Sequence, residues 1–498
     1  MSWRLLVLFF TCPGVLISNI THAQPSRPLF IIPGILGSKL CDRSTNNVVW
    51  GDRLSLFRFT QLKLPTNYEP DNLPHTACGI IDSIQILGPW RSHQYDRLKT
   101  YLGSLGYKEG RDLFFFDYDW RLSNRFTARK LQTFIAAHAP TGQIDIVAHS
   151  MGGIVARLYI QELGGGARVN RFLTMGTPHL GAANVFKTLD EGWSWYENLM
   201  AHGVTGIRTT ALSFPAMLEL LPGYPKCCAW RQPTGSAVEY FDPFDFKVWQ
   251  RFSWMPSDVR AGGDGNRFSR DLSEAKSIHN VLAQPLPATI RHVNIATSLI
   301  PTAWRVVAQP ADGKIVEFLT WPGDGTVMDF SASNGANSDA RPSSSEHARI
   351  FADSAAEQVV RWVLREDTIP TAGVLRDFQA SLRAADGSLQ KITGVSYEAP
   401  SALIIGEKGV FTVEISGEAS LGDADLSNVT AAVDTTQSTL RVSRRRDRRE
   451  SNGSITVTLE MEFTAPPMEG VHSISLSLPG VSELQDYFLV VGTGQIPR

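Results

Sequence analysis

The stretch Asp145-Ile146-Val147-Ala148-His149-Ser150-Met151-Gly152-Gly153-Ile154-Val155-Ala156 decides the fold class of this chain. The β-branched run 144–147 predicts a buried strand, and the apolar spacing of 153–163 predicts a helix. Ser150 lies at the turn between them, with Ala148 two residues before it and Gly152 two residues after it. A strand, a tight turn and a helix with serine at the tip form a nucleophile elbow, whose strained backbone admits only small flanking residues. The G-x-S-x-G pattern has Gly where Ala148 stands, so the match is one of size. We therefore expect Ser150 to be a nucleophile; a structural serine in an ordinary turn is the alternative.

The composition is that of a folded protein without strong electrostatic preferences. The chain has 498 residues, of which 43% are hydrophobic, enough for a sizeable core and for more than one domain. The 47 Lys and Arg residues nearly balance the 49 Asp and Glu residues, which gives a net charge of -2. This balance argues against a nucleic-acid partner, because no overall basic field is present to attract one.

The first 23 residues resemble an export signal. Arg4 provides a positive start, residues 5–10 are apolar, and Thr21-His22-Ala23 offers small residues for cleavage. Pro13-Gly14 interrupts the apolar run, which favours a cleaved signal peptide over an uncleaved anchor. We expect residues 1–23 to be removed and the mature protein to be secreted or periplasmic.

Five cysteines accompany this expected export. Cys12 would leave with the signal peptide, and four cysteines in an oxidising compartment allow three pairings. We favour Cys41–Cys78, which closes a loop. Cys227 and Cys228 are then either joined to each other or free.

Strand and helix patterns alternate through residues 24–368. Strands are predicted at 28–32, 113–116, 144–147, 171–175, 290–296 and 314–319, and helices at 93–106, 128–138, 153–163 and 350–364. Such alternation predicts an α/β domain with a doubly wound, mostly parallel sheet.

Two segments interrupt this alternation. Residues 41–87 are irregular and rich in Pro, Asn and aromatic residues, and we interpret them as a lid. Residues 182–287 hold several tryptophans with many Pro and Gly, which suits a cap over an apolar substrate site. The alternative for the second segment is a subdomain whose aromatic residues only form a core.

Residues 372–498 have a different pattern. Short alternating strands are predicted at 410–415, 429–433, 455–463, 471–478 and 487–491, which indicates a separate antiparallel β-sandwich. The segment contains no Cys and no Trp, so the core signature of antibody domains is absent. We expect the run Arg444-Arg445-Arg446-Asp447-Arg448-Arg449 to be a solvated hairpin tip; contact with an anionic surface is the alternative.

A serine nucleophile needs a base and a carboxylate that orients the base. In α/β folds with a nucleophile elbow, these partners follow in the order Ser, Asp, His. Asp324 lies in a Gly-Asp-Gly turn after the strand at 314–319, and His347 precedes the last helix of the domain. His179, His279 and His292 are alternative bases, and Asp329 is an alternative carboxylate.

The oxyanion formed during acyl transfer needs preplaced N–H donors. The residue after the nucleophile supplies one, which makes Met151 a candidate. The glycine-rich loop at 33–38 follows the first strand, and Ile35 is its best candidate for the second donor.

Four spaced motifs carry a family resemblance. They are Pro33-Gly34-Ile35-Leu36-Gly37-Ser38-Lys39-Leu40, Tyr118-Asp119-Trp120-Arg121-Leu122, Ala148-His149-Ser150-Met151-Gly152-Gly153 and Gly323-Asp324-Gly325-Thr326-Val327. Over residues 28–365 the chain resembles the lecithin:cholesterol acyltransferase-like family, which includes lysosomal phospholipase A2 and phospholipid:diacylglycerol acyltransferases.

The resemblance implies an α/β-hydrolase fold, a triad of Ser150, Asp324 and His347, no metal or other cofactor, and transfer or hydrolysis of lipid acyl esters. The family's disulfide-closed lid loop resembles the segment from Cys41 to Cys78, and the stretch 118–122 is expected to support the site. The chain departs from the family at Thr177-Pro178-His179-Leu180-Gly181, which resembles bacterial lipases, and in its β-domain.

These observations favour a secreted serine enzyme acting on lipid or other hydrophobic esters, in contact with a membrane surface. An acyl group on Ser150 would pass either to water or to an alcohol. The alternative from another class is a non-catalytic surface- or matrix-binding protein that uses the β-domain. The sequence indicates neither the acyl donor and acceptor nor the oligomeric state.

Overall fold

The computed structural model describes residues 27–491, except 53, 82, 88–89, 94, 193–201, 233–237, 253–254, 256–265, 299, 334–338, 344–346, 353, 366–391, 399–401, 418–428, 434–436, 441, 450–454, 469 and 479–480. The predicted signal peptide lies outside the described residues, as does the predicted boundary between the α/β domain and the β-domain. None of the described helices is long and apolar enough to cross a membrane.

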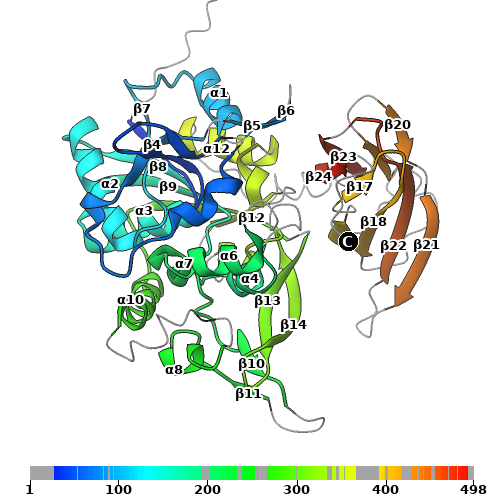
Figure 1. Cartoon of the computed structure of the whole chain (residues 1–498). Helices are drawn as coiled ribbons and strands as arrows, with labels where there is room; N and C mark the ends of the chain where they lie inside the picture. Colours follow the sequence, from blue (N-terminus) through cyan, green and yellow to red (C-terminus); the bar gives the residue numbers. More distant parts are fainter. Residues whose placement is uncertain are drawn as a thin grey trace, which may run out of the picture.

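A parallel six-stranded sheet forms the centre of the α/β domain (Figure 1). Every described pairing in it is parallel. Its order is β15 (Asp339–Ser343), β12 (Arg291–Thr297), β9 (Val169–Met175), β8 (Ile144–His149), β1 (Leu29–Ile32) and β7 (Leu113–Phe115).

Alternation along the strands divides the core into two layers, because successive side chains of a strand point to opposite faces. Phe30 and Ile32 pack in one apolar cluster with side chains of α2 (Asn124–His138) and α3 (Met151–Glu162). Leu29 and Ile31 pack in another with side chains of α1 (Asp96–Ser104) and α12 (Ser354–Arg365). The predicted doubly wound α/β fold is confirmed.

One strand predicted for this sheet belongs elsewhere. β14 (Ile315–Gly323), predicted at 314–319, pairs antiparallel with β13 (Ile300–Ala308) in a second sheet of order β11-β10-β13-β14. The connection between β13 and β14 is a tight turn closed by a Gln309 N–H to Lys314 carbonyl bond. A parallel pairing needs a crossover of a dozen or more residues, so this turn permits only an antiparallel hairpin.

The edge strand β15 of the main sheet is not among the strands predicted from the sequence. β15 has the sequence Asp-Ala-Arg-Pro-Ser, which lacks the apolar run of a central strand. It lies at the edge of the sheet, where a proline is tolerated because only one side of the strand is paired.

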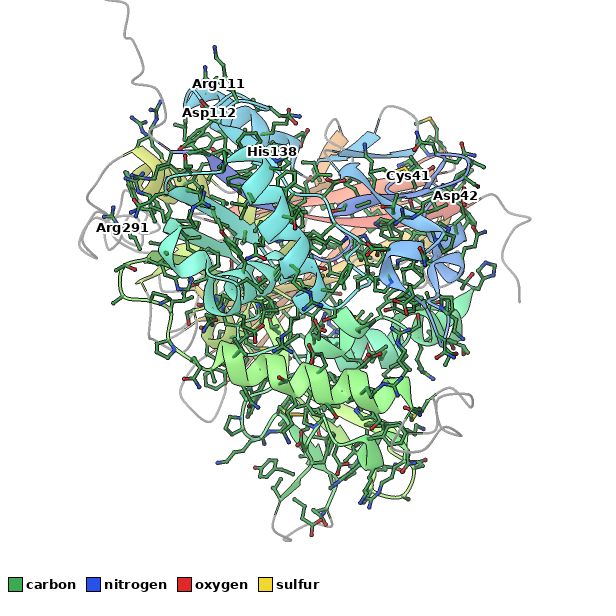
Figure 2. All side chains as sticks on the ribbon, turned by 90° about the vertical axis from the view of Figure 1, so that its left-hand side faces the viewer. Cys41, Asp42, Arg111, Asp112, His138 and Arg291 are labelled. Carbon is green, nitrogen blue, oxygen red and sulfur yellow. A yellow bond between two sulfur atoms is a disulfide. The ribbon has the colours of Figure 1, made fainter. Side chains whose placement is uncertain are left out.

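The lid is ordered, and the prediction of an irregular segment at 41–87 was wrong. β2 (Ser38–Asp42), β3 (Val48–Trp50) and β4 (His75–Ile80) form a small antiparallel sheet of order β3-β2-β4. The remainder includes two 3-10 helices, η1 (Leu56–Leu62) and η2 (Pro70–Asn72), and β5 (Ser83–Leu87), which pairs with β6 (Trp90–His93). Each of these strands has only three to six residues, which is too short for a clear periodic sequence pattern. In Figure 2, Cys41 and Asp42 of β2 lie across the molecule from Arg111, Asp112 and Arg291, which lie where β7 and β12 begin.

Both sets of cysteines are bonded. Cys41 and Cys78 form the disulfide that the sequence favours, and it joins β2 to β4. Cys227 is bonded to its neighbour Cys228.

We expect the Cys41→Ala/Cys78→Ala double variant to lose about 4 kcal/mol of unfolding free energy, because the bond closes a loop of nearly forty residues in the unfolded chain. The Cys227→Ala/Cys228→Ala variant is the matched control, since adjacent residues close no loop and this entropic contribution is absent. Denaturant titration of both variants measures the difference. Equal losses, or free thiols at Cys41 and Cys78 in exported protein, would contradict the expectation.

The apolar side chains of the segment 182–287 belong to the same buried cluster as one face of the main sheet. Its described helices are α4 (Asn184–Glu191), α6 (Gly203–Ala211), α7 (Pro215–Glu219), α8 (Phe246–Trp249) and α10 (Arg267–Leu282). Trp249 is fully buried against Phe186, Phe252 and Phe268. β10 (Cys228–Trp230) and β11 (Glu239–Tyr240) join β13 and β14 in the second sheet. This cap therefore continues beyond the predicted limit of 287, through β13 and β14.

The C-terminal strands form two mainly antiparallel sheets around one apolar core, beside the α/β domain (Figure 1). One sheet has the order β16 (Ile392–Glu398), β18 (Lys408–Gly417), β22 (Ile455–Thr464) and β21 (Val442–Arg449). The other has the order β17 (Ala402–Ile404), β24 (Val481–Val491), β23 (Gly470–Leu478), β19 (Thr430–Val433) and β20 (Gln437–Leu440).

The arginine run is not a hairpin tip, so that prediction was wrong. Residues 444–449 lie within β21, an edge strand paired along its length with β22. Arg446 is ion-paired with Glu460 of β22, and Arg445 with Asp447. Charged side chains suit an edge strand, because they oppose pairing with a strand of another molecule.

Candidate active site

Ser150 has the backbone of a nucleophile elbow. It follows β8 and precedes α3 with φ 51° and ψ −129°, a region that residues other than glycine rarely occupy. The turn packs closely on the end of β1. A Cβ on Gly152 would lie 2.4 Å from the Ile32 carbonyl oxygen and 2.5 Å from that of Pro33. The small flanking residues noted in the sequence therefore meet a steric demand of the fold.

We expect Gly152→Ala to cost roughly 3 kcal/mol of unfolding free energy and to lower activity, because main-chain atoms must shift to admit the methyl group. Gly103→Ala is the matched control, since nothing lies within 4 Å of a Cβ at that position in α1. The control should be neutral or slightly stabilising, because Ala favours a helix over Gly. Equal stability of the two variants in thermal unfolding would contradict the packing argument.

Three side chains distant in the sequence meet at this turn. His347 Nε2 lies 2.8 Å from Ser150 Oγ, and His347 Nδ1 lies 2.7 Å from Asp324 Oδ2. A carboxylate only accepts hydrogen bonds, so Nδ1 carries the proton and Nε2 is free to accept one from the serine hydroxyl. The structure thus brings together the serine, carboxylate and histidine predicted from the sequence, in the geometry that activates a serine.

The backbone holds Asp324 and His347 in place. Asp324 directly follows β14 and is 1% exposed, and its Oδ1 accepts the N–H groups of Thr326 at 3.0 Å and Val327 at 2.7 Å. His347 begins η4 (His347–Ala352), and its N–H donates to the Asp324 carbonyl at 2.9 Å. One carboxylate oxygen of Asp324 therefore accepts two backbone N–H groups, and the other faces the imidazole of His347.

The alternative bases and the alternative carboxylate have other partners. His179 contacts Asn294 at 3.0 Å, His279 contacts the Glu219 carbonyl at 3.1 Å, and His292 stacks on Phe172. Burial lowers the pKa of each of these histidines, to about 4 for His279 and about 3 for His292. Asp329 contacts Ser298 and Trp321. In the described structure, none of these four residues contacts Ser150.

Gly176 was missed in the sequence. It follows β9 with φ +57°, and a Cβ there would lie 3.0 Å from both Asp324 Oδ2 and His347 Nδ1. Its place directly after a central parallel strand is the feature that would have identified it, because the carboxyl ends of such strands carry the site.

The loop at 33–37 lies against the nucleophile, as an oxyanion loop must. A Cβ on Gly34 would lie 2.8 Å from the Ser150 Cβ. Hydrogen bonds fix the loop: Tyr118 donates to the Pro33 carbonyl at 2.7 Å, Trp50 to the Leu36 carbonyl at 2.9 Å, and the Gly34 N–H donates to Tyr95 Oη at 2.9 Å.

One predicted oxyanion donor belongs to the fixed loop, and the other directly follows Ser150. Ile35 follows Gly34 in the fixed loop, and Met151 is the first residue of α3. An N–H at the start of a helix has no acceptor within that helix. Both donors are therefore candidates for an oxygen bound beside Ser150.

The stretch 118–122 supports the site, as the family resemblance implies. Trp120 is fully buried and donates to the Ser38 carbonyl at 3.0 Å. Arg121, also buried, is ion-paired with Asp119 and donates to the Leu62 carbonyl of the lid at 2.9 Å. The stretch therefore ties the loop and the lid to the end of β7.

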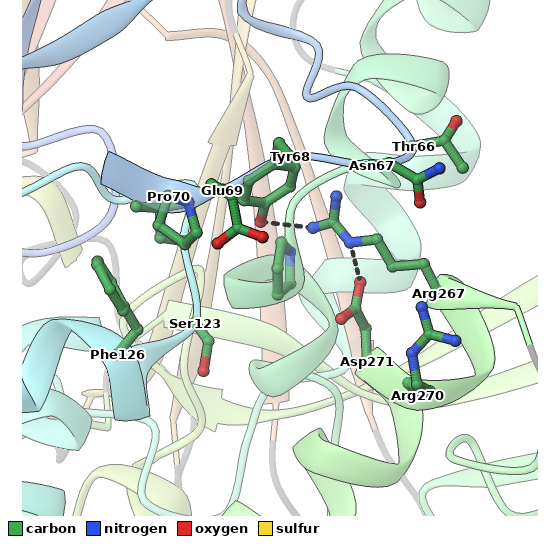
Figure 3. Close-up of a pocket in the computed structure, with 12 residues that line it drawn as sticks. Thr66, Asn67, Tyr68, Glu69, Pro70, Ser123, Phe126, Arg267, Arg270 and Asp271 are labelled. Carbon is green, nitrogen blue, oxygen red and sulfur yellow. Dashed lines mark hydrogen bonds and ion pairs between the residues drawn. The ribbon is translucent and has the colours of Figure 1, made fainter. Parts of the chain in front are cut away.

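A cavity of about 380 Å³ lies between the lid and the cap (Figure 3). Arg267 of α10 crosses it to the lid, where it lies over the Tyr68 ring and donates to the Pro65 carbonyl, while it pairs with Asp271 of its own helix. Burial raises the pKa of Asp271 to about 6 and that of Tyr68 to about 12. Ser150, Asp324 and His347 do not line this cavity, whose main feature is a polar junction between lid and cap.

No group of His, Cys, Asp and Glu suited to hold a metal ion occurs among the residues that the structure describes.

Comparison with known proteins finds relatives of the part of the chain that holds the elbow. The family model for lecithin:cholesterol acyltransferase matches residues 75–280, which include the nucleophile elbow. A lecithin-cholesterol acyltransferase-like 4 protein of Arabidopsis thaliana is 24% identical over 242 residues, 41% of this chain and 43% of the relative. A phospholipase A(1) LCAT3 of the same plant is 34% identical over 100 residues, 18% of this chain and 22% of the relative. Over these residues the chain is similar to the lecithin:cholesterol acyltransferase-like family.

The chain spans less than half of the length of these two relatives. Among solved structures, a Tle4-Tli4 complex is 15% identical, with 67% of this chain and 97% of that chain covered and a TM-score of 0.46. A Bacillus licheniformis lipase, BlEst2, is 13% identical, with 67% and 89% covered and a TM-score of 0.28.

Proposed function

We propose that this protein is a serine enzyme that cleaves lipid or other hydrophobic esters and passes the acyl group to water or to an alcohol. The hydrogen-bonded array of Ser150, His347 and Asp324, on a strained elbow, carries the proposal. Similarity to the lecithin:cholesterol acyltransferase family and to a phospholipase A(1) supports the substrate class.

The first half of the reaction makes an acyl-enzyme. Ser150 Oγ attacks the ester carbonyl carbon while His347 Nε2 takes the hydroxyl proton. The carbonyl oxygen becomes an oxyanion that accepts the Ile35 and Met151 N–H groups. His347 then gives its proton to the leaving oxygen, the carbon–oxygen bond breaks, and an alcohol departs.

The second half regenerates the enzyme. Water or an alcohol loses its proton to His347 and attacks the acyl carbon, and His347 returns that proton to Ser150 Oγ as the acyl group leaves. Asp324 keeps the imidazole in one orientation and stabilises its charged form. Water yields a free acid and an alcohol yields a new ester, so the acceptor alone separates hydrolysis from transfer.

The other segments have proposed roles around this centre. We propose that residues 1–23 export the protein, that the lid at 41–87 and the cap at 182–287 enclose the substrate, and that residues 372–498 are a separate domain outside the chemistry. Two disulfides suit an oxidising compartment outside the cytoplasm. Contact with a lipid surface follows from the proposed substrate.

A fluorophosphonate probe tests the proposal, because it labels an activated serine covalently. We expect one adduct, mapped to the Ser150 peptide and absent in Ser150→Ala. A panel of lipid esters, with and without added long-chain alcohol, then separates free acid from new ester. A folded wild-type protein that neither reacts with the probe nor cleaves any ester would contradict the proposal and favour the surface-binding alternative.

A further inference from the structure

Three hydrogen bonds form a buried chain behind the candidate site. The Gly34 N–H and Tyr95 Oη are 2.9 Å apart, Tyr95 Oη and His149 Nδ1 are 2.8 Å apart, and His149 Nε2 and the His347 carbonyl oxygen are 3.0 Å apart. Tyr95 precedes α1, and His149 is the last residue of β8, directly before Ser150. The chain thus joins the loop at 33–37, the nucleophile strand and the start of η4.

For a neutral His149, only one set of proton positions satisfies all three contacts. The His347 carbonyl only accepts, so His149 Nε2 must carry a proton and donate it. In the neutral imidazole Nδ1 is then an acceptor, and the Tyr95 hydroxyl donates to it while accepting the Gly34 N–H. Burial lowers the pKa of His149 to about 3 and raises that of Tyr95, so both groups are neutral across the ordinary working range of pH.

Packing leaves these two side chains little freedom. Tyr95 is 2% exposed and stacks on Phe351 of η4 at 4.7 Å between ring centroids. His149 meets the same phenylalanine edge to face at 5.1 Å. Phe351 lies in the short helix that begins at His347, so the aromatic contacts and the hydrogen bonds restrain the same segment.

The two ends of this chain of hydrogen bonds lie next to an oxyanion donor and the base, two groups that must act together. Gly34 precedes Ile35, a candidate oxyanion donor, and the far end holds the main chain of the candidate base. In acyl transfer the base and the oxyanion donors must be correctly placed around the same carbonyl at the same moment. A displacement of about 1 Å costs on the order of 100-fold in rate.

We propose that Tyr95 and His149 are positioning residues that hold the oxyanion loop and His347 in register with Ser150. This inference rests on the proposed function and deepens it. Neither side chain contacts the substrate or takes a proton from it; each acts through the main chain of another residue.

Tyr95→Phe removes one buried oxygen and breaks two of the three bonds. We expect kcat on a soluble p-nitrophenyl ester, counted per active site titrated with fluorophosphonate, to fall by about 10- to 100-fold, with KM changed less than about threefold. Tyr224→Phe is the matched control, because Tyr224 is also buried and donates to the Trp304 carbonyl. It should lose similar stability and keep its kcat per site, since a purely structural hydroxyl alters the amount of folded enzyme and not the rate of each site.

His149 variants probe the other bond. His149→Gln can keep an N–H for the His347 carbonyl and should retain several-fold more kcat than His149→Leu, which cannot donate. The kcat of the Tyr95→Phe/His149→Leu double variant should be no lower than that of the slower single variant. Both changes break the same chain of hydrogen bonds, so their effects should not multiply.

The outcomes separate this inference from the proposed function. A wild-type rate per site in Tyr95→Phe, or losses that multiply in the double variant, would contradict the positioning role of Tyr95 and His149. The proposed triad would still stand. If Tyr95→Phe does not fold, His149→Gln and His149→Leu are compared instead. Equal kcat values per site in these two variants would contradict the positioning role. A wild-type enzyme without serine reactivity overturns both.

Discussion

Ser150→Ala is expected to lower kcat for ester cleavage by about 10⁴- to 10⁶-fold, because the acyl-enzyme can no longer form. The fold should persist, since Ala is smaller than Ser and the elbow tolerates small residues. Initial rates on a p-nitrophenyl ester, with unfolding curves for both proteins, measure the two effects. Ser104→Ala, an exposed serine at the end of α1, is the matched control and should leave both quantities unchanged.

The partners of Ser150 extend this test. His347→Gln and Asp324→Asn should each lower kcat by several orders of magnitude, and neither should add to the loss in Ser150→Ala, because the three groups act as a unit. Turnover near the wild-type rate in Ser150→Ala would show that another group is the nucleophile. Additive losses would show that the three residues work separately.

Acidification is expected to destabilise the protein strongly between about pH 6.5 and 4. Burial lowers the pKa of five histidines: to about 3 for His149 and His292, to about 4 for His279, below the usual value for His75 and well below it for His179. A histidine with a lowered pKa in the folded state contributes stability above its unfolded pKa of 6.5, and that contribution is lost as the pH falls. One pKa unit corresponds to about 1.4 kcal/mol, so His149, His279 and His292 each lose roughly 3 kcal/mol of this stabilisation by pH 4.

Four carboxyl groups act in the opposite direction. Burial raises the pKa of Glu219 to about 7 and that of Asp271 to about 6, and it also raises the pKa of Asp145 and of Asp190. Raised carboxyl pKa values cost stability at high pH, and this cost is relieved as the groups take up protons on acidification. They offset part of the loss from the histidines, and we expect a net loss of several kcal/mol, a large part of an ordinary folding free energy of 5–15 kcal/mol.

Denaturant unfolding at pH 7, 5.5 and 4.5 measures this loss. His279→Gln provides the sharp control, because Gln can keep the donation to the Glu219 carbonyl but takes up no proton. Its unfolding free energy should fall less steeply with acidification between pH 6 and 4.5, by about 1.4 kcal/mol per pH unit. A stability that is flat or rises on acidification, or an unchanged slope in His279→Gln, would contradict the assignment of neutral buried histidines.

The sequence predicted the local structure wherever all the residues that determine it lie within one short segment. The elbow was predictable because its strand, its small residues and its helix are contiguous. The motif requires a small residue at Gly152, and in the structure a Cβ there would collide with the Ile32 carbonyl. The parallel core was predictable because apolar strands alternate with amphipathic helices. The candidate triad could be named because chain order restricts the partners in this fold.

Pairing between strands was decided by tertiary structure. β14 has the composition of a core strand, yet it joins β13 because a short turn leaves no room for a crossover. β15, with an unremarkable loop-like sequence, closes the edge of the main sheet. The lid strands and the arginine strand β21 likewise form because they pair with neighbouring strands, and not because of a periodic pattern in their own sequences.

The candidate site shows the same division between local and tertiary information. Sequence predicted what kinds of groups were needed and ranked His347 above three other histidines, but only the fold places its Nε2 2.8 Å from Ser150. Tyr95 falls within the predicted helix at 93–106, but only the fold sets its hydroxyl between the Gly34 N–H and His149. Local sequence specifies backbone geometry and hydrophobic faces, because those depend on near neighbours. Hydrogen bonds between residues 50 to 200 positions apart depend on how whole elements pack, and packing is a property of the complete chain.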